Sequence, residues 1–128
     1  MQLTLPIYYT QEFKTKPSKT FLVSMNWYRG AFYHIQNEVK KHYHSLVQEQ
    51  KPEGKFSTFH VDYSLYYKNP SCDASNVIAL IEKFTLDALK DCDTIIDDKV
   101  KYHLSSSWAV LGQDKENPRV EITIKDAI

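Results

Sequence analysis

The sequence predicts an α+β fold of two layers, in which a mixed β-sheet packs against two main helices. Three observations support this class. Apolar residues recur at helical spacing over residues 26–50 and again over residues 74–90. Over residues 55–67 and 100–110 apolar residues alternate with others, which is the period of a β-strand. Strands and helices interleave along the chain, but a turn alone joins the last two strands, which predicts a mixed sheet.

The length and composition predict one folded domain over residues 1–128. A chain of this size can bury a core without disulfides. Cys72 and Cys92 are therefore expected to be free thiols in a reducing cytosol. No apolar run approaches the ~20 residues of a membrane span, and no signal peptide is recognisable at the N-terminus. We therefore expect a cytoplasmic protein.

The first half of the chain is expected to contain two short strands and one long helix. Residues 2–8 alternate apolar and polar positions, which predicts a short strand, and residues 11–19 are rich in lysine and predict a basic loop. Residues 21–23 predict a second extended piece. A helix is expected over residues 26–50, with Asn26 as its N-cap.

The second half is expected to supply the central strand, a second helix and two further strands. The expected segments are a turn over 50–54, a strand over 55–67, a helix over 74–90, an acidic loop over 91–98, and strands over 100–110 and 119–125. The strand over 55–67 is the longest of these and is expected at the centre of the sheet.

Charge is divided unevenly along the chain, although the formal net charge is zero. Residues 1–60 contain eight Lys or Arg against four Asp or Glu, and residues 61–128 contain eight against twelve. Such a division fits an acidic metal site beside a basic surface that follows phosphates. Chance unevenness of a solvated surface is the alternative.

Oxygen ligands suited to a metal ion gather at both ends of the second expected helix. Asp73 directly precedes the helix, and Asp97 and Asp98 precede a strand. Carboxylates at two such junctions can converge on Mg²⁺ if the helix packs on the sheet. Lys83 and Asp87 share one helical stripe and are expected to face the same cleft. The alternative is that these residues are an ordinary helix N-cap and a solvated acidic loop.

The same stretch carries an ordered motif. The string Asp73-x-Ser75-Asn76, then Glu82-Lys83-Phe84-x-x-Asp87-Ala88-Leu89, then Ile95-Ile96-Asp97-Asp98 resembles the RusA-type Holliday-junction resolvases. That family has D-x-D-N, a helix with a lysine and D-A-L, a short turn, and an apolar residue with D-D before a strand. The resemblance extends in order over about residues 70–124.

The resemblance implies a small homodimeric, Mg²⁺-dependent endonuclease that nicks four-way DNA junctions symmetrically during recombination and repair. It implies Asp73 and Asp98 as metal ligands and catalytic residues, with Asp97 as a further metal ligand and Asp87 assisting. Lys83 is expected to contact the scissile phosphate. The expected cellular setting is the cytoplasm of a bacterium or a phage-infected cell.

Two positions depart from the family pattern. Ser75 stands where many members have a second metal-binding aspartate, and a hydroxyl is a weaker, neutral ligand. Ala79 stands where the helical lysine is often found, one turn before Lys83. A second hypothesis is therefore a protein of the same fold that binds branched DNA without cutting it. A third is an interaction domain without affinity for DNA.

Basic and aromatic residues of the first half are the expected DNA contacts. The residues expected to bind DNA are Lys14, Lys16, Lys19, Arg29, Lys40, Lys41 and, from the motif, Asn76. Tyr8, Tyr9, Phe13 or Trp27 are candidates for stacking at an opened junction centre, although each is individually more often a core residue.

Overall fold

The computed structural model describes residues 1–50 and 54–127, and its α+β architecture confirms the predicted fold class. Among these residues the elements are β1 (Gln2–Pro6), β2 (Tyr8–Gln11), β3 (Lys19–Leu22), α1 (Met25–Gly30), α2 (Tyr33–Glu49), β4 (Phe59–Tyr67), α3 (Ala74–Asp91), β5 (His103–Gln113) and β6 (Arg119–Asp126). The four-stranded sheet has the order β1-β6-β4-β5, while β2 and β3 form a separate two-stranded sheet. The turn predicted over residues 50–54 falls largely outside the described residues.

The central strand is β4, as the sequence predicts. It pairs antiparallel with β6 and parallel with β5. Its residues Phe59, Val61, Tyr63 and Leu65 are almost fully buried, and the residues between them are only partly buried. The parallel pair β4 and β5 is connected through α3, because parallel strands need a crossover connection.

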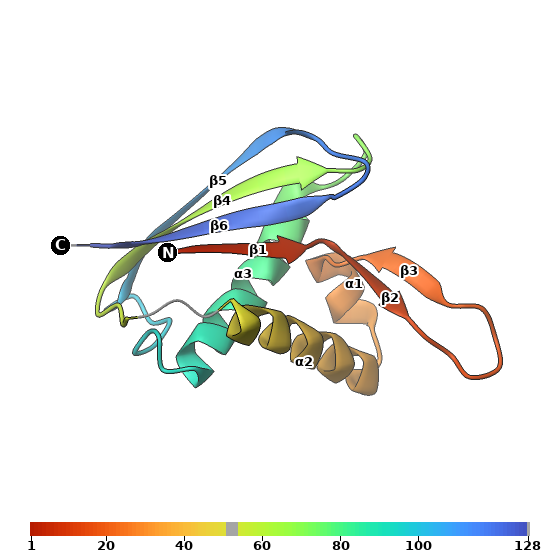
Figure 1. Cartoon of the computed structure of the whole chain (residues 1–128), viewed down its shortest axis with the longest axis horizontal. Coiled ribbons are helices and arrows are strands. Elements are labelled where there is room, and N and C mark those ends of the chain that lie inside the picture. Colours follow the sequence, from red (N-terminus) through yellow and green to blue (C-terminus); the bar gives the residue numbers. More distant parts are fainter. Residues whose placement is uncertain (51–53, 128) are drawn as a thin grey trace.

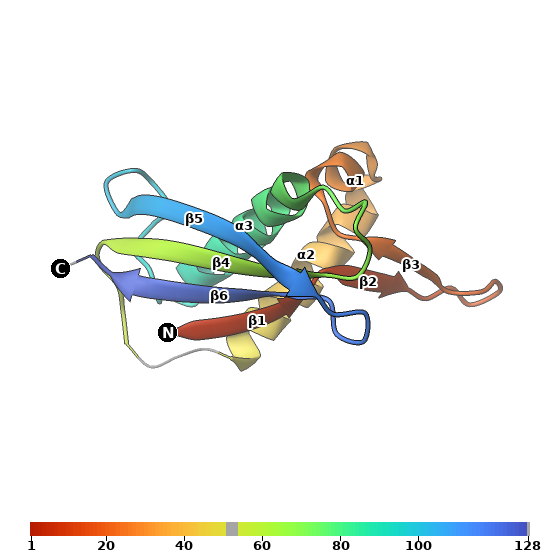
Figure 2. The ribbon, with the colours of Figure 1, turned by 90° about the horizontal axis from the view of Figure 1, so that it is seen from above.

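The helices cover one face of the four-stranded sheet and leave the other face open (Figures 1 and 2). The core lies between the two layers. Phe84 of α3 stacks on Tyr43 of α2 with 5.3 Å between ring centroids, and it meets Tyr28 of α1 edge-on at 5.8 Å. The Tyr43 hydroxyl donates a hydrogen bond to the carbonyl of Pro6 at the end of β1. One aromatic cluster therefore joins all three helices to the sheet.

The single helix expected over residues 26–50 is wrong, because the structure divides it into α1 and α2. Ala31 and Phe32 have extended backbones (ψ 149° and 147°) between the two helices. Gly30, a poor helix former, ends α1. The side chain of Gln36 donates a hydrogen bond to the carbonyl of Tyr28, which replaces a helical hydrogen bond lost at the break. The expected N-cap is also displaced: the Ser24 hydroxyl, not Asn26, accepts from the Trp27 N–H at 3.3 Å.

The first expected strand is shorter than residues 2–8, because the chain leaves the main sheet after Pro6. From Tyr8 it forms β2, which pairs antiparallel with β3. The lysine-rich segment over residues 11–19 contains the whole connection of this hairpin, with Gln11 ending β2 and Lys19 beginning β3, and the hairpin projects from the body of the molecule (Figure 1). Ile7, between the two sheets, is fully buried, and its carbonyl accepts from the Val23 N–H at 2.8 Å.

The strand expected over residues 100–110 begins later and ends later, at His103 and Gln113. Val100 precedes it and is 89% exposed. By contrast β6 is confirmed, with Val120, Ile122 and Ile124 directed into the core. None of the helices in the described part of the chain has both the length and the apolar character that crossing a membrane requires.

Candidate functional site at the N-terminal end of α3

Asp73 is the N-cap of α3 and is held by the two residues that follow it in the motif. Its Oδ1 accepts from the Ser75 hydroxyl at 3.1 Å and from the Asn76 backbone N–H at 3.4 Å. Its Oδ2 accepts from the Asn76 side-chain amide at 2.9 Å. These bonds, the one from the Asn76 side chain first, lower the pKa of the Asp73 carboxyl below its ordinary value. The result is an exposed, ionised carboxylate in a fixed orientation.

Asn76 therefore positions Asp73 and is not free to contact a ligand with its whole amide. Its Nδ2 donates to Asp73, and its Oδ1 accepts from the Asn26 backbone N–H at 3.1 Å. This second bond fixes α1 against the first turn of α3. This geometry supports a role of Asn76 in orienting the Asp73 carboxylate. It does not support the expected role of Asn76 as a DNA contact.

The other expected metal ligands lie at the opposite end of α3. The helix is 18 residues long, which corresponds to about 27 Å. Asp97 sits at its C-terminal end, with Oδ1 3.3 Å from Lys90 Nζ and Oδ2 3.6 Å from Lys99 Nζ. The expectation that Asp73 converges with Asp97 and Asp98 is therefore wrong within one chain. Across residues 1–50 and 54–127, no group of three or more His, Cys, Asp or Glu is placed to hold a metal ion.

The two charged residues of the expected helical stripe pair with each other. Lys83 and Asp87 form an i,i+4 ion pair with 3.8 Å between Nζ and Oδ2. Lys83 is not buried, since 45% of its side chain is exposed, whereas Leu80 on the same stripe is fully buried. Lys83 follows Asp73 by ten positions, about 15 Å along the helix. Within one chain these two residues do not share a site with Asp73.

Asp73 instead lines a small depression of about 250 Å³ between α3 and the start of β2. Tyr8 and Asn69 line this depression and also a larger one of about 710 Å³, so the two adjoin. Two lysines line the larger depression, Lys68 from the loop after β4 and Lys115 from the turn after β5. A carboxylate and two ammonium groups therefore gather at the same end of the molecule.

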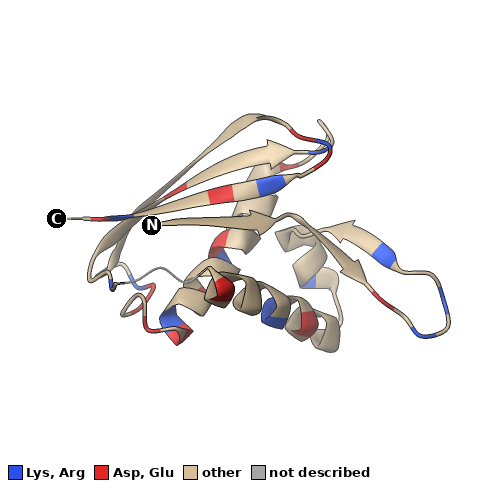
Figure 3. Ribbon diagram, viewed as in Figure 1, with Lys and Arg blue, Asp and Glu red and all other residues tan. Residues whose placement is uncertain are grey.

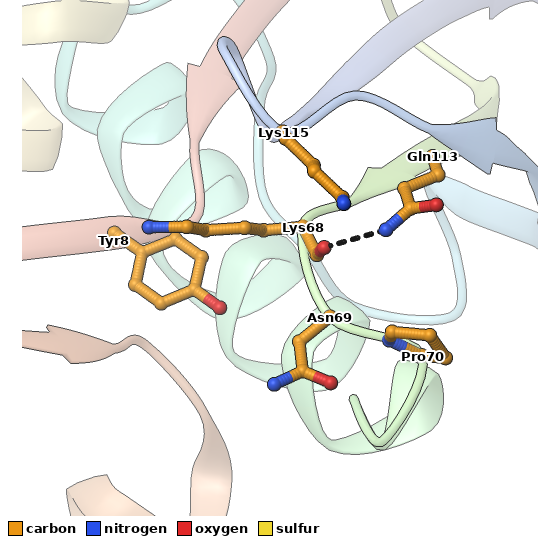
Figure 4. Close-up of a pocket in the computed structure, with 6 residues that line it drawn as sticks. All are labelled: Tyr8, Lys68, Asn69, Pro70, Gln113 and Lys115. Carbon is orange, nitrogen blue, oxygen red and sulfur yellow. Dashed lines mark hydrogen bonds between the residues drawn. The ribbon is translucent and has the colours of Figure 1, made fainter.

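The arrangement of the larger depression follows from the parallel pairing of β4 and β5 (Figure 4). The Gln113 side chain donates to the Lys68 carbonyl at 3.0 Å and holds the ends of the two strands together. Lys68 extends over the Tyr8 ring, with Nζ 5.5 Å from its centroid. Lys68 and Lys115 were not among the expected DNA contacts, because the strand pairing that joins them is not visible in either local segment.

The expected basic DNA-contacting residues lie on the β2–β3 hairpin, on α1 and on α2, where the ribbon carries Lys and Arg (Figure 3). Lys14 and Lys16 lie in the hairpin connection, and Lys19 lines a depression of about 390 Å³ together with Trp27. Arg29 lies in the last turn of α1. A separate depression of about 530 Å³ on the outer face of α2 is lined by Lys40, Lys41 and His44, with Asn37 and Ser45. Asn26 lines both the depression at Lys19 and the depression at Asp73, so these two adjoin, whereas Lys40 and Lys41 line a separate depression on α2.

Neither a protein-family model nor a curated protein matches the chain. The resemblance to RusA-type resolvases therefore stays a prediction from the motif. What the site offers chemically is one oriented carboxylate, neutral hydroxyl and amide groups, two lysines and an aromatic ring, a set suited to a phosphate-containing ligand with unpaired bases.

Proposed function

We propose that the protein binds branched DNA as a homodimer and cleaves its phosphodiester backbone with Mg²⁺. The observation that carries the proposal is the adjacency of Asp73 to the depression lined by Lys68 and Lys115. A phosphate held by the lysines would lie next to an ionised carboxylate. The ordered motif over residues 73–98 gives independent support.

Each group has a separate task in this proposal. Lys68 and Lys115 attract the DNA backbone, and the Tyr8 ring offers a surface on which an unpaired base can stack. Asp73 fits one ligand position of Mg²⁺, an ion that usually takes one or two carboxylates and completes its shell with water and phosphate oxygens. Bound there, the ion would supply an activated water and neutralise charge on the phosphate. Ser75 and Asn76 keep the carboxylate oriented.

A site that used Asp98 as well would need two chains. Asp73 and the Asp97–Asp98 pair lie at opposite ends of α3, so a second molecule would have to bring its acidic loop to the first. A two-fold dimer suits this arrangement, because a four-way junction has near two-fold symmetry. The symmetry of the substrate and the spacing of the carboxylates both support the proposed dimer.

Binding of branched DNA without cleavage is the second candidate, and the local geometry of Asp73 favours it. Ser75 donates its hydroxyl hydrogen to Asp73 Oδ1, so it uses part of the coordination capacity of that oxygen instead of adding a second charge. A site with one carboxylate holds Mg²⁺ weakly. The lysine-lined depression would serve binding equally well in both cases.

A synthetic four-way junction separates these functions. The wild-type chain is expected to bind the junction more tightly than a duplex of the same length and to nick it when Mg²⁺ or Mn²⁺ is added. Binding would be followed by gel shift and nicking by denaturing gel. Tight binding without cleavage in either metal would leave only the second candidate. Absence of any salt-dependent binding would contradict both.

Removing the two lysines tests the proposed DNA surface. Lys68→Ala combined with Lys115→Ala is expected to weaken junction binding to a similar degree for every sequence. It should also lower the slope of log K against log salt by about 1.8, because each lost phosphate contact contributes ~0.9. Lys40→Ala with Lys41→Ala, on the outer face of α2, is the matched control. An equal or larger effect of the control would move the DNA surface to α2.

A further inference from the structure

The depression of about 390 Å³ that Lys19 lines is walled by aromatic rings, and we call it the aromatic depression. Phe21 of β3 and Trp27 of α1 stack there, with 4.7 Å between ring centroids and 27° between ring planes. Phe32, in the break between α1 and α2, also lines it and is 78% exposed. Gly30 leaves space beside these rings, because a Cβ at this position would have open space around it to 4 Å. A flat, unpaired base can therefore enter and pack against the rings.

The aromatic depression is one end of a continuous track of three depressions. It shares Asn26 with the depression of about 250 Å³ at Asp73. That depression in turn shares Tyr8 and Asn69 with the lysine-lined depression of about 710 Å³. The β2–β3 hairpin, α1, the start of α3 and the turn between β5 and β6 all lie at the same end of the molecule (Figures 1 and 2). The ionised carboxylate of Asp73 thus lies between aromatic rings on one side and two lysines on the other.

The basic groups beside the aromatic depression are not neutralised within the chain. Lys14 and Lys16 lie in the hairpin connection between Gln11 and Lys19, and these last two residues both line the depression. Within the described part of the chain, the Lys and Arg side chains of residues 1–50 form no salt bridge, whereas those that do form one all lie at or after position 55. Unneutralised cations attract phosphate groups. Positive charge therefore stands at both ends of the track.

We propose that this track binds one unpaired strand of DNA, with a base in the aromatic depression and the backbone running past Asp73 to Lys68 and Lys115. Sites for single strands combine the same two elements, a positively charged groove that follows the backbone and aromatic rings on which bases stack. The bases of a duplex are stacked on one another and paired, so fully paired arms offer no base to the aromatic depression. The inference rests on the proposed function for the role of Asp73, and it narrows the substrate to DNA with a single-stranded branch.

The two tryptophans of the chain make occupancy of the aromatic depression observable. In Trp108→Phe the remaining tryptophan is Trp27, and its fluorescence should be quenched by an oligothymidylate of about 12 nucleotides, a length within the range of single-strand sites. In Trp27→Phe the remaining tryptophan lies on β5 and lines none of the three depressions, so its fluorescence should stay unchanged. Titration in the presence of EDTA measures binding independently of any cleavage.

Filling the aromatic depression tests the site without removing a contact. Gly30→Leu places a side chain in the open space and should weaken oligothymidylate binding at least about fivefold, the lower end of what one stacked base contributes. The melting temperature should not fall, because leucine is a better helix former than glycine. The matched control is Gly112→Leu on β5, where a Cβ would also meet open space and which lines none of the three depressions. The control should bind as the wild type does.

Cleavage then separates this inference from the proposed function. With Mg²⁺, a duplex carrying one single-stranded branch should be nicked at least about fivefold faster than a four-way junction whose arms are all paired, again by the contribution of one stacked base. Quenching of Trp27 that Gly30→Leu weakens, without nicking of either DNA, would support the track and contradict the proposed cleavage. Nicking of both DNAs at equal rates, absence of quenching, or quenching that Gly30→Leu leaves unchanged would each overturn the track and leave the proposed function to its own test.

Discussion

Replacing Asp73 with asparagine is expected to reduce junction cleavage by at least about 100-fold, because a metal ion in such a site contributes several kcal/mol to the transition state. Junction binding and folding should stay close to those of the wild type. Asparagine caps helices as well as aspartate does, so α3 keeps its N-terminal hydrogen bond. Nicking rates under single-turnover conditions, with a gel-shift titration of the same preparation, would measure the two effects separately.

Two further variants at this site sharpen that test. Asp73→Ala removes the cap as well as the charge and should lower the free energy of unfolding by ~1 kcal/mol, an effect that Asp73→Asn should not share. Ser75→Asp supplies a second carboxylate at an exposed position and is expected to lower the Mg²⁺ concentration needed for cleavage. Cleavage by Asp73→Asn at the wild-type rate would exclude this carboxylate from the reaction.

Mixing two inactive variants distinguishes a site within one chain from a site between chains. Asp98→Asn is expected to be as inactive as Asp73→Asn. In a mixed dimer, an intact Asp73 of one chain would meet an intact Asp98 of the other, so the mixture should recover part of the wild-type activity. A mixture as inactive as its components would mean that both residues act within the same chain, against the separation along α3.

Replacing Phe84 with alanine is expected to be the most destabilising single change, lowering the free energy of unfolding by ~3–5 kcal/mol. Phe84 is 1% exposed and packs on Tyr43 and Tyr28, so its removal leaves a cavity where the three helices meet. Urea denaturation followed by circular dichroism would measure the loss.

Two substitutions serve as controls for this effect. Phe84→Leu keeps most of the apolar volume and should cost clearly less than Phe84→Ala. Lys83→Ala, at the neighbouring exposed position, should change the free energy of unfolding by no more than ~0.5 kcal/mol. A loss below ~1 kcal/mol for Phe84→Ala would show that the helices meet elsewhere.

The parts of the fold that could be predicted are those where burial follows the local period of the chain. Strand β4 and helix α3 each bury one clear set of residues, such as Val61 and Ile81, and their positions were predicted within a few residues. The break at residues 31–32 was missed, because the apolar spacing continues through it from Tyr28 to Ile35. Gly30 and the extended backbone of Ala31 and Phe32 interrupt the helix without interrupting the apolar spacing.

In the candidate site, too, the residues that could be predicted are those with a local sequence signal. The motif located Asp73 correctly as the residue before a helix, and the structure adds its partners. The motif could not give the distance between Asp73 and Asp98. That distance depends on the length and direction of α3, which lies between the two residues. Lys68 and Lys115 gave no local signal, since 46 positions separate them and only the parallel strands bring them together.

The hydrogen bonds that hold Asp73 have a practical consequence for detecting ligands of this protein. The carboxylate that would receive a cation already stabilises the first turn of α3. A cation that draws the carboxylate away from the helix would give up a cap worth ~1 kcal/mol, which offsets part of the stabilisation expected from binding. Cations are therefore expected to bind weakly at this site, and thermal shift and titration calorimetry should agree on that weak affinity, because the cost of releasing the cap is part of the binding free energy that both report.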